Sequence, residues 1–424
     1  MGTATGSDET GFEVNGRIYA PPAGRVVAVI CIDGCADAYL NAALSRGAMP
    51  RLERALGNGG FRTLARAALP TFTNVNNACI VTGVPPAATG ISGNFFLDPD
   101  TGAEVMMNSP EFLRCGTILA AAGAAGRKVA FVTAKDKLRT LLSKGLQGIA
   151  FSSEKVDEAR RETHGIAHVE ALVGRLKPDI YSAEASLYVL EAGLALAHAG
   201  MADFLYLSLT DYLQHKFGPE APECLAFYRA IDREIGRLID FGAVAAITAD
   251  HGMNAKNRPD GSPNVIFLES ELLAEFGTGL RVVCPITDPY VAHHGALGSF
   301  VSVHVNGVAR LPAMVEWLRA REGVTEVYTR EEAVRDLELP GDRIGDLSVL
   351  SGSDVVLGRT PADHDLRLLE GGLRSHGGRF EEMVPLIVTE ALDASHPLLG
   401  GGEIRNFDVF DLACNATATK AGGA

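Results

Sequence analysis

Short apolar runs that end at an aspartate recur along the chain, and they restrict the fold more than any other feature of the sequence. In three of them a carboxylate follows at once or after one threonine: Val27–Ile32 before Asp33, Phe204–Leu209 before Asp211, and Ala243–Ala249 before Asp250. Runs that are apolar throughout and alternate with longer stretches of helical spacing are typical of parallel strands buried on both faces. The sequence therefore predicts an α/β fold in which helices sandwich a largely parallel sheet.

The clearest strands of this predicted sheet all end in polar residues. They are Arg25–Ile32, Lys128–Thr133, Asp203–Leu209, Ala243–Ala249 and Met383–Thr389. Ligands of open α/β sheets bind at the carboxyl ends of the strands. Because Asp33, Asp211 and Asp250 follow such ends, we expect them to lie on one rim of the sheet.

The stretch from Asn257 to Leu373 differs from the rest, because its strand-like pieces are shorter and turn residues are frequent between them. These pieces are Phe300–Val305, Val324–Tyr328 and Val355–Leu357. A chain of 424 residues also exceeds what one hydrophobic core usually organises. We therefore expect an inserted, smaller α+β cap domain at residues 257–373, and a discontinuous core made of residues 20–256 and 374–424.

Charge and cysteine content bear on the kinds of partner. Lysines and arginines number 38 against 52 aspartates and glutamates, and the net charge of −14 argues against a nucleic-acid surface, which would have to neutralise phosphates. The start Met1–Asn15 does not resemble a secretory leader, and no apolar run approaches the ~18 residues of a membrane span. Seven scattered cysteines fit a reducing compartment. We expect a cytoplasmic protein with no nucleic-acid or membrane partner, and both a monomer and a homodimer stay open.

Histidines stand beside two of the strand-end aspartates. Asp211 and His215 are four residues apart, which places both side chains on one face if a helical turn follows the strand. Asp250 and His251 are adjacent, so their side chains diverge unless the loop turns sharply at Gly252. A single strand-end aspartate is equally explained as a helix cap. Carboxylate oxygen combined with imidazole nitrogen, however, is a ligand set that suits zinc.

Other histidines compete for the same role. His376 lies in Arg374–Gly378, where flanking glycines allow a close backbone approach, although a histidine in such a loop is on its own more often solvated. His164 and His168 have helical ligand spacing but follow no strong core strand, so we interpret them as part of an exposed helix. We interpret the pair His293–His294 as cap residues that face the site.

A segment with two threonines precedes a predicted helix. Leu69–Asn77 contains Thr71 and Thr73 and leads into the apolar run Ala78–Val81. A hydroxyl at a helix N-terminus meets unpaired N–H groups and the positive end of the helix dipole, and both favour an alkoxide or a phosphoryl oxygen. The alternative interpretation is an N-cap threonine without chemistry.

These segments, in this order, resemble the alkaline phosphatase superfamily, and more closely its nucleotide pyrophosphatase/phosphodiesterase-like branch. The resemblance covers about Val26 to Ala413 and is carried by Asp33 at the first strand end, Pro-Thr-x-Thr-x-x-Asn from Pro70, Asp211-x-x-x-His215, Asp250-His251-Gly252-Met253 and His376-Gly377. It implies an alkaline-phosphatase-like core that binds metal and carries the inserted cap. It also implies hydrolysis at phosphorus with two Zn²⁺ ions per chain.

The resemblance gives each of these residues a role. It implies one ion at Asp211, His215 and His376, and a second ion at Asp33, Asp250, His251 and the nucleophile. The implied nucleophile is Thr73, with Thr71 as the fallback, and it forms a phosphothreonine. Asn94 is implied to donate to a phosphoryl oxygen of the substrate. The ligands His215 and His376 are expected to line the substrate position as well.

Within this branch the likeness is greatest to members that hydrolyse phosphonoacetate to acetate and phosphate. It is carried by Asn74–Asn77, Thr133–Leu138 and His293–Ser299, and the first of these departs from the Phe-Pro-Asn-His of the diesterases. Breaking a carbon–phosphorus bond releases a carbanion, whose charge needs cationic donors. Lys135 and Lys137 project to one side if the chain is extended there, so we expect both to bind the carboxylate of the small phosphonate substrate.

Several alternatives stay open. The two lysines are also explained as a solvated surface pair. The protein as a whole could act as a zinc-dependent phosphodiesterase or phosphomonoesterase, or on another small phosphonate. A metal-stabilised binding protein without turnover is the non-catalytic alternative, although a structural zinc site is normally closed by four protein ligands and needs no nucleophile.

Overall fold

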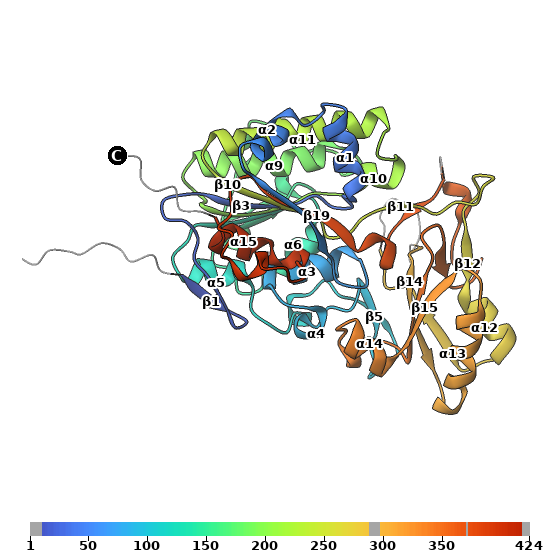
Figure 1. Ribbon diagram of the computed structural model, residues 1–424. Coiled ribbons are helices and arrows are strands. Elements are labelled where there is room, and N and C mark those ends of the chain that lie inside the picture. Colours follow the sequence, from blue (N-terminus) through green and yellow to red (C-terminus); the bar gives the residue numbers. More distant parts are fainter. Residues whose placement is uncertain (1–10, 288–296, 370–371, 418–424) are drawn as a thin grey trace, which may run out of the picture.

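A seven-stranded sheet forms the centre of the molecule (Figure 1). The structure is a computed structural model and describes residues 11–287, 297–369 and 372–417. In spatial order the strands are β4 (Phe61–Arg66), β19 (Met383–Val388), β10 (Val244–Thr248), β3 (Val27–Cys31), β9 (Phe204–Ser208), β7 (Val129–Thr133) and β8 (Ile149–Ser152). The strands from β10 to β8 are parallel to one another, whereas β19 is antiparallel to both of its neighbours.

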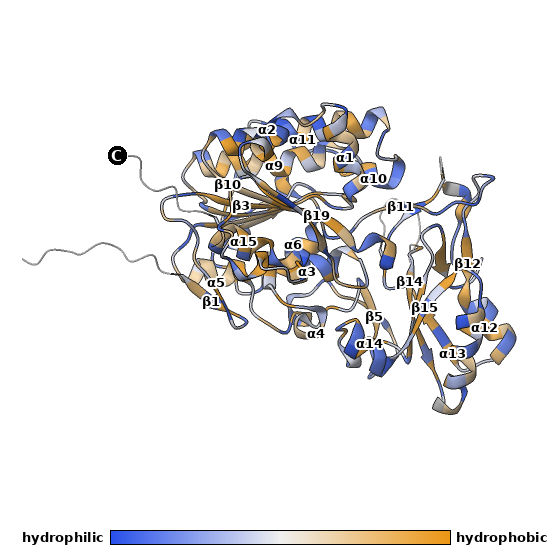
Figure 2. Cartoon of the chain, viewed as in Figure 1, coloured by the Kyte–Doolittle hydropathy of each residue, from blue (hydrophilic) through white to orange (hydrophobic). Residues whose placement is uncertain are grey.

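The predicted core strands and the largely parallel sheet are confirmed. Strands β3, β7, β9 and β10 are buried at every residue, as expected for strands covered on both faces. Figure 2 shows the apolar colouring that runs through this layer. Neither edge strand was predicted. Most residues of β4 are only partly buried and its polar residues hide the strand pattern, and β8 has only four residues.

Helices cover both faces of the sheet (Figure 1). One face carries α1 (Asp37–Ser45), α2 (Pro50–Gly57), α9 (Glu184–His198) and α11 (Pro222–Asp240). The other face carries α3 (Thr73–Thr82), α5 (Ile118–Ala124), α6 (Asp136–Leu142) and α15 (Val409–Asn415). Shorter helices lie in the connections: α4 (Pro86–Thr89), α7 (Arg161–His164), α8 (Val169–Val173) and α10 (Tyr212–Lys216).

A smaller antiparallel sheet lies beside this core (Figure 1). Its strands are, in spatial order, β13 (Leu280–Val283), β14 (Phe300–Val305), β16 (Leu347–Ser351) and β15 (Val324–Thr329), accompanied by α12 (Leu268–Phe276), α13 (Leu311–Ala320) and α14 (Arg330–Asp336). Its apolar cluster is drawn from residues 266–357. The α/β core with a smaller α+β part is therefore confirmed, while the boundaries 20–256, 374–424 and 257–373 stay a prediction.

Two-stranded pairs complete the fold. They are β1 (Phe12–Val14) with β2 (Arg17–Tyr19), β5 (Phe95–Leu97) with β6 (Glu104–Met106), β11 (Asn254–Ala255) with β18 (Arg374–Ser375), and β12 (Val265–Phe267) with β17 (Val356–Gly358). The β11–β18 pair joins the two chain segments that flank the smaller sheet in sequence, with Asn254 opposite Ser375. All seven cysteines lie in the described ranges and are free thiols. Among the described helices, none has the length and apolar character that crossing a membrane requires.

Candidate active site

The three strand-end aspartates lie side by side. Strands β10, β3 and β9 are neighbours, so the loops after them open onto one rim of the sheet. Asp250, Asp33 and Asp211 are all buried there. Gly34 permits this close approach, because it has a positive φ of 69° and a Cβ there would lie 3.0 Å from the Asp211 Cβ. The predicted common rim is confirmed.

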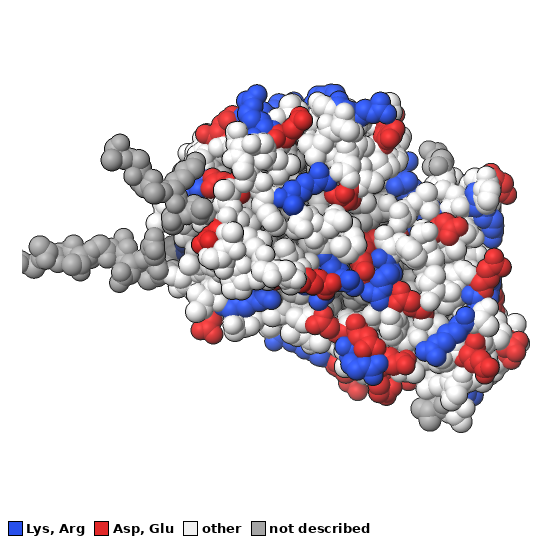
Figure 3. Space-filling model, viewed as in Figure 1, with Lys and Arg blue, Asp and Glu red and all other residues white. Residues whose placement is uncertain are grey.

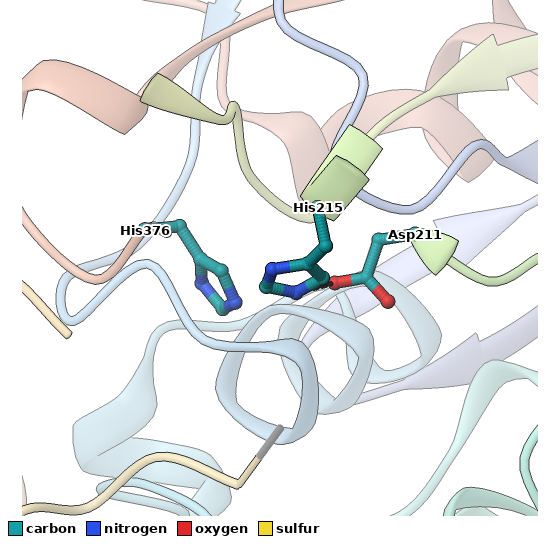
Figure 4. A group of neighbouring side chains, drawn as sticks. All are labelled: Asp211, His215 and His376. Carbon is teal, nitrogen blue, oxygen red and sulfur yellow. Dashed lines mark ion pairs between the residues drawn. The ribbon is translucent and has the colours of Figure 1, made fainter. Parts of the chain in front are cut away.

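Asp211, His215 and His376 form the first group of candidate metal ligands (Figure 4). Helix α10 begins directly after Asp211, and its turn brings His215 Nε2 to 2.9 Å from Asp211 Oδ2, so the predicted common face is confirmed. His376 follows β18, and its ring centroid lies 5.7 Å from that of His215. The ligand atoms of the three side chains lie within 4.8 Å of one another, close enough to share one cation.

Asp33, Asp250, His251 and Thr73 lie next to this group. His251 Nε2 is 3.3 Å from Asp33 Oδ1 and 3.6 Å from Asp250 Oδ2. The same nitrogen is 3.3 Å from Thr73 Oγ1. Asp33 and His251 also form a group within 4.8 Å that includes Asp211, which therefore lies between the two candidate ion positions.

All three imidazoles are held in the same tautomer by their assigned hydrogen bonds. The Nδ1–H groups of His215, His251 and His376 donate to the carbonyls of Arg374, Gly252 and Thr71 at 3.0, 2.9 and 2.7 Å. Each Nε2 lone pair is thereby left for a cation. Burial, with His251 and His215 nearby, lowers the pKa of His376 well below its usual value, which keeps this ring neutral as a metal ligand must be.

The pKa values of Asp33 and Asp211 are shifted as expected for carboxylates that bind a cation. Burial raises the pKa of Asp33 well above its usual value, and so do the neighbours Asp211 and Asp250. Burial acts in the same direction on Asp211, but Lys135 and His215 outweigh it and hold that pKa well below its usual value. Asp33 Oδ1 is buried and accepts no hydrogen bond from the described residues. Lys135 Nζ contacts the other oxygen of this carboxylate, Oδ2. A buried oxygen left without a hydrogen bond is costly, so Oδ1 fits a ligand of a divalent metal.

Thr73 is placed for chemistry at the end of a helix. It is the first residue of α3, and its Oγ1 faces His251. Asn94 lies over the same helix end, because its Oδ1 accepts from the Asn74 N–H at 3.3 Å. The Asn94 Nδ2 donates to Thr287 Oγ1 at 2.6 Å. The NH₂ group of Asn94 therefore faces Thr287, and its donation to a phosphoryl oxygen of the substrate stays a prediction.

Thr71, the fallback nucleophile, uses its hydroxyl elsewhere. The hydroxyl donates to the Gly378 carbonyl at 3.0 Å and accepts from the Gly377 N–H at 3.0 Å, and the side chain is fully buried. These contacts favour Thr73 as the nucleophile.

The segment from Lys135 to Lys137 is not extended throughout, because α6 begins at Asp136. Lys135 is the N-cap of α6 and Lys137 falls in its first turn, so the expectation that both project to one side of an extended segment is wrong. Lys135 Nζ lies 2.6 Å from Asp33 Oδ2 and 3.0 Å from Asp211 Oδ1, among the candidate ligands. Lys137 is exposed. Substrate binding by the two lysines stays a prediction.

The competing histidines do not form a metal group within the described residues. Helix α7 ends at His164, whereas His168 is the N-cap of α8 with a positive φ of 57°, so one exposed helix does not contain both. His293 and His294 lie outside the described residues.

Two residues of the site were not predicted from the sequence. Asn77, inside α3, donates to Asp250 Oδ2 at 3.0 Å, and Thr287 contacts Asn94. Asn77 carried a signal, since it is one of the residues that depart from the diesterase motif. Thr287 carried none, because only the tertiary fold brings it to Asn94.

The sequence matches the family of type I phosphodiesterases and nucleotide pyrophosphatases over residues 27–378. This range contains all of the candidate ligands and Thr73. The chain belongs to this family. It is therefore a hydrolase of a metal-dependent family, and the resemblance drawn from the motifs is confirmed.

Two crystal structures of phosphonoacetate hydrolase from Sinorhizobium meliloti are similar to this chain, one in complex with phosphonoacetate and the other with phosphonoformate. Each has 46% sequence identity and a TM-score of 0.91, over 97% of this chain and 100% of that chain. Murine ectonucleotide pyrophosphatase/phosphodiesterase 5 shares the fold, with 15% identity and a TM-score of 0.58 over 94% of this chain and 98% of that chain. The alkaline-phosphatase-like fold is thereby confirmed.

Proposed function

We propose that this protein hydrolyses the carbon–phosphorus bond of phosphonoacetate to give acetate and phosphate. The observation that carries the proposal is 46% identity, over 97% of the chain, with a phosphonoacetate hydrolase crystallised with phosphonoacetate. The site supports it, because a threonine at a helix end, a cluster of candidate metal ligands and a lysine gather on one rim of the sheet.

Two divalent cations, which we propose are zinc, would be held by ligands of this chain. One would bind Asp211, His215 and His376, and the other Asp33, Asp250, His251 and Thr73. Such a pair of cations would stabilise charge on both the attacking and the departing side of a displacement at phosphorus. The mixture of carboxylate oxygen and imidazole nitrogen supports zinc over magnesium.

Thr73 is the proposed nucleophile. The Thr73 hydroxyl gives its proton to water and Oγ1 attacks phosphorus, so that a phosphorus–oxygen bond forms while the phosphorus–carbon bond breaks and its electron pair leaves with the carbon. Asn94 Nδ2 and the positive end of α3 stabilise charge on the phosphoryl oxygens. The departing carbon takes a proton from water to give acetate. A second water then hydrolyses the phosphothreonine and releases phosphate.

The leaving group explains the proposed role of the two lysines. The carbanion can delocalise its charge onto the adjacent carboxylate, and cations that contact this group stabilise the charge as it develops. Lys135 is the N-cap of α6, and its Nζ already lies among the ligand carboxylates. Lys137 follows in the first turn of this helix. We propose that both bind the substrate carboxylate.

Hydrolysis of a phosphate ester is the second candidate function, because the matching family is one of phosphodiesterases and pyrophosphatases. One assay separates the two: zinc-loaded protein is given phosphonoacetate, an aryl phosphodiester and an aryl phosphomonoester, and release of phosphate or alcohol is measured. We expect the highest kcat/KM for phosphonoacetate. Rapid diester cleavage without phosphate release from phosphonoacetate would overturn the first proposal.

Replacing the nucleophile tests the proposed chemistry directly. Thr73→Ala should abolish phosphonoacetate turnover because no hydroxyl is left to attack, whereas Thr73→Ser should keep part of it. Metal content, measured by elemental analysis, shows whether any loss comes from missing zinc. Turnover that survives in the alanine variant would mean that Thr71 or a water attacks phosphorus.

Lys135→Ala and Lys137→Ala test the assignment of the carboxylate site. Each should lower kcat for phosphonoacetate by about 10²- to 10³-fold, the usual cost of one donor to a developing anion. Hydrolysis of an aryl phosphate, which has no such carboxylate, should change far less. Lys128→Ala is a matched control, because Lys128 precedes the opposite end of β7. Equal losses on both substrates would refute the role.

A further inference from the structure

We propose that Asn77 is a positioning residue that fixes the candidate ligand Asp250 relative to the candidate nucleophile Thr73. Its importance for catalysis rests on the proposed function. Its effect on metal binding does not depend on which substrate the enzyme uses.

The Asn77 amide is fully buried in α3, and both of its polar atoms are satisfied. Nδ2 donates to Asp250 Oδ2 at 3.0 Å and to the Thr73 carbonyl at 3.0 Å. Oδ1 accepts from the Tyr206 hydroxyl at 2.6 Å and from the Ser208 hydroxyl at 3.0 Å. One side chain thus joins the first turn of the nucleophile helix, the ligand after β10, and strand β9.

The two hydroxyls of β9 set the direction of this amide. Burial raises the pKa of Tyr206 well above its usual value, so the phenol stays protonated and donates. With Tyr206 and Ser208 donating, Oδ1 of Asn77 faces the strand and the NH₂ group faces Asp250. The flipped amide would place its oxygen against the carboxylate, and two buried acceptors in contact are unfavourable.

The other oxygen of Asp250 is held by the backbone. Oδ1 accepts from the Gly34 N–H at 3.2 Å and from the His251 N–H at 3.1 Å. Because Asn77 binds Oδ2, the plane of the carboxylate is fixed from both sides. Partners of this kind orient a metal ligand, and their loss typically weakens metal affinity about 10- to 100-fold.

The neighbouring Asn76 offers a matched control. It is equally buried in the same helix, but its side chain bonds the Ala68 N–H and carbonyl at 2.7 and 2.9 Å and Asn406 Nδ2 at 3.1 Å. None of these partners is a candidate ligand. If Asn77 only satisfied buried polar groups, the two asparagines would behave alike on substitution.

Zinc titration of the full-length protein against a chromophoric chelator tests the proposal. In Asn77→Ala the affinity for one of the two ions should fall about 10- to 100-fold, while the other ion stays bound. In Asn76→Ala both affinities should stay unchanged although the melting temperature falls. Unchanged zinc affinities in Asn77→Ala would overturn the proposal.

A second variant keeps the test decisive if Asn77→Ala does not fold. The double substitution Tyr206→Phe and Ser208→Ala leaves Asn77 in place but removes the donors that orient it. Zinc affinity should fall in the same direction, and kcat should fall while KM stays the same. Unchanged zinc affinity and kcat would refute the inference. If the variants bind zinc more weakly but the unsubstituted protein does not turn over phosphonoacetate, the proposed substrate is refuted and the inference about Asn77 stands.

Discussion

At the scale of single residues, Thr71 shows how a side chain near the nucleophile can organise a ligand that is distant in sequence. Its carbonyl accepts from His376 Nδ1 at 2.7 Å, and its hydroxyl bonds Gly377 and Gly378. Gly377 has a φ of 120°, and a Cβ there would lie 2.4 Å from the Phe72 ring. The segment before α3 and the His376 loop are therefore packed as one unit.

Thr71→Val should weaken zinc binding at the group formed by Asp211, His215 and His376. Valine has the shape of threonine but no hydroxyl, so the buried Gly377 N–H loses its acceptor at a cost of about 1–3 kcal/mol. We expect a lower free energy of unfolding in urea and less zinc retained at a given chelator concentration. Thr71→Ser keeps the hydroxyl and is the control. A valine variant that holds zinc as tightly as the serine variant would contradict the prediction.

The residue types of the site could be predicted from the sequence, because most ligands and the threonines stand in short motifs with local spacing. The position of Lys135 could not, since it depends on whether α6 begins at Asp136. The role of Asn77 could not either, because its hydroxyl partner Tyr206 lies 129 positions further along the chain.

At the scale of elements, the order β10–β3–β9 explains why the strand-end aspartates meet. That the strands were parallel could be inferred from their continuous apolar runs and the helices between them. The direction of β19 could not be inferred, because an apolar run looks the same in either orientation.

A buried ion pair joins the segment after β11 to the segment after β18. Lys256 Nζ donates to Glu381 Oε1 and to the Ser353 carbonyl, both at 2.8 Å, and both charged side chains are fully buried. Glu381 also accepts from Asn254 Nδ2 at 2.7 Å and from the Gly378 N–H at 3.0 Å. The pair therefore anchors the loop that carries His376.

Lys256→Met should destabilise the fold strongly. Glu381 would keep a buried charge without its partner, and breaking such a pair on one side typically costs about 3–5 kcal/mol. The double substitution Lys256→Met and Glu381→Gln should recover much of this loss, because no buried charge is left unpaired. Urea unfolding of the single and double variants measures the difference. A double variant that is less stable than Lys256→Met would contradict the explanation.

At the scale of the whole molecule, the smaller sheet is tied to the core by apolar and charged contacts together. Phe300 belongs to the apolar cluster of the core. Arg379 pairs with Glu326 at 2.7 Å and Arg405 with Glu338 at 2.9 Å. Side chains of both signs gather over this junction on the face drawn in Figure 3. Sequence patterns could indicate the inserted segment. They could not indicate how it packs against the core, because these contacts join residues far apart in the chain.

Removal of the proposed zinc ions should lower the stability of the whole protein. A cation that binds only the folded state stabilises it by about 2.7 kcal/mol when its free concentration is 100 times its Kd. Without the cation, Asp33, Asp211 and Asp250 stay buried beside one another. Differential scanning calorimetry should therefore show a lower melting temperature after treatment with a chelator, and zinc should restore it.

Asp33→Asn separates this charge effect from a general loss of structure. The raised pKa of Asp33 means that its carboxylate form is unfavourable in the folded protein, chiefly because of burial. After chelation, the variant should therefore melt at a higher temperature than the unchanged protein, since one buried negative charge is gone and Lys135 can still pair with Asp211. Added zinc should raise its melting temperature less, because one ligand is weaker. A chelated variant that melts at a lower temperature than the chelated unchanged protein would mean that the Asp33 carboxylate stabilises the fold without metal. Repulsion among the carboxylates could then not explain the effect of the chelator.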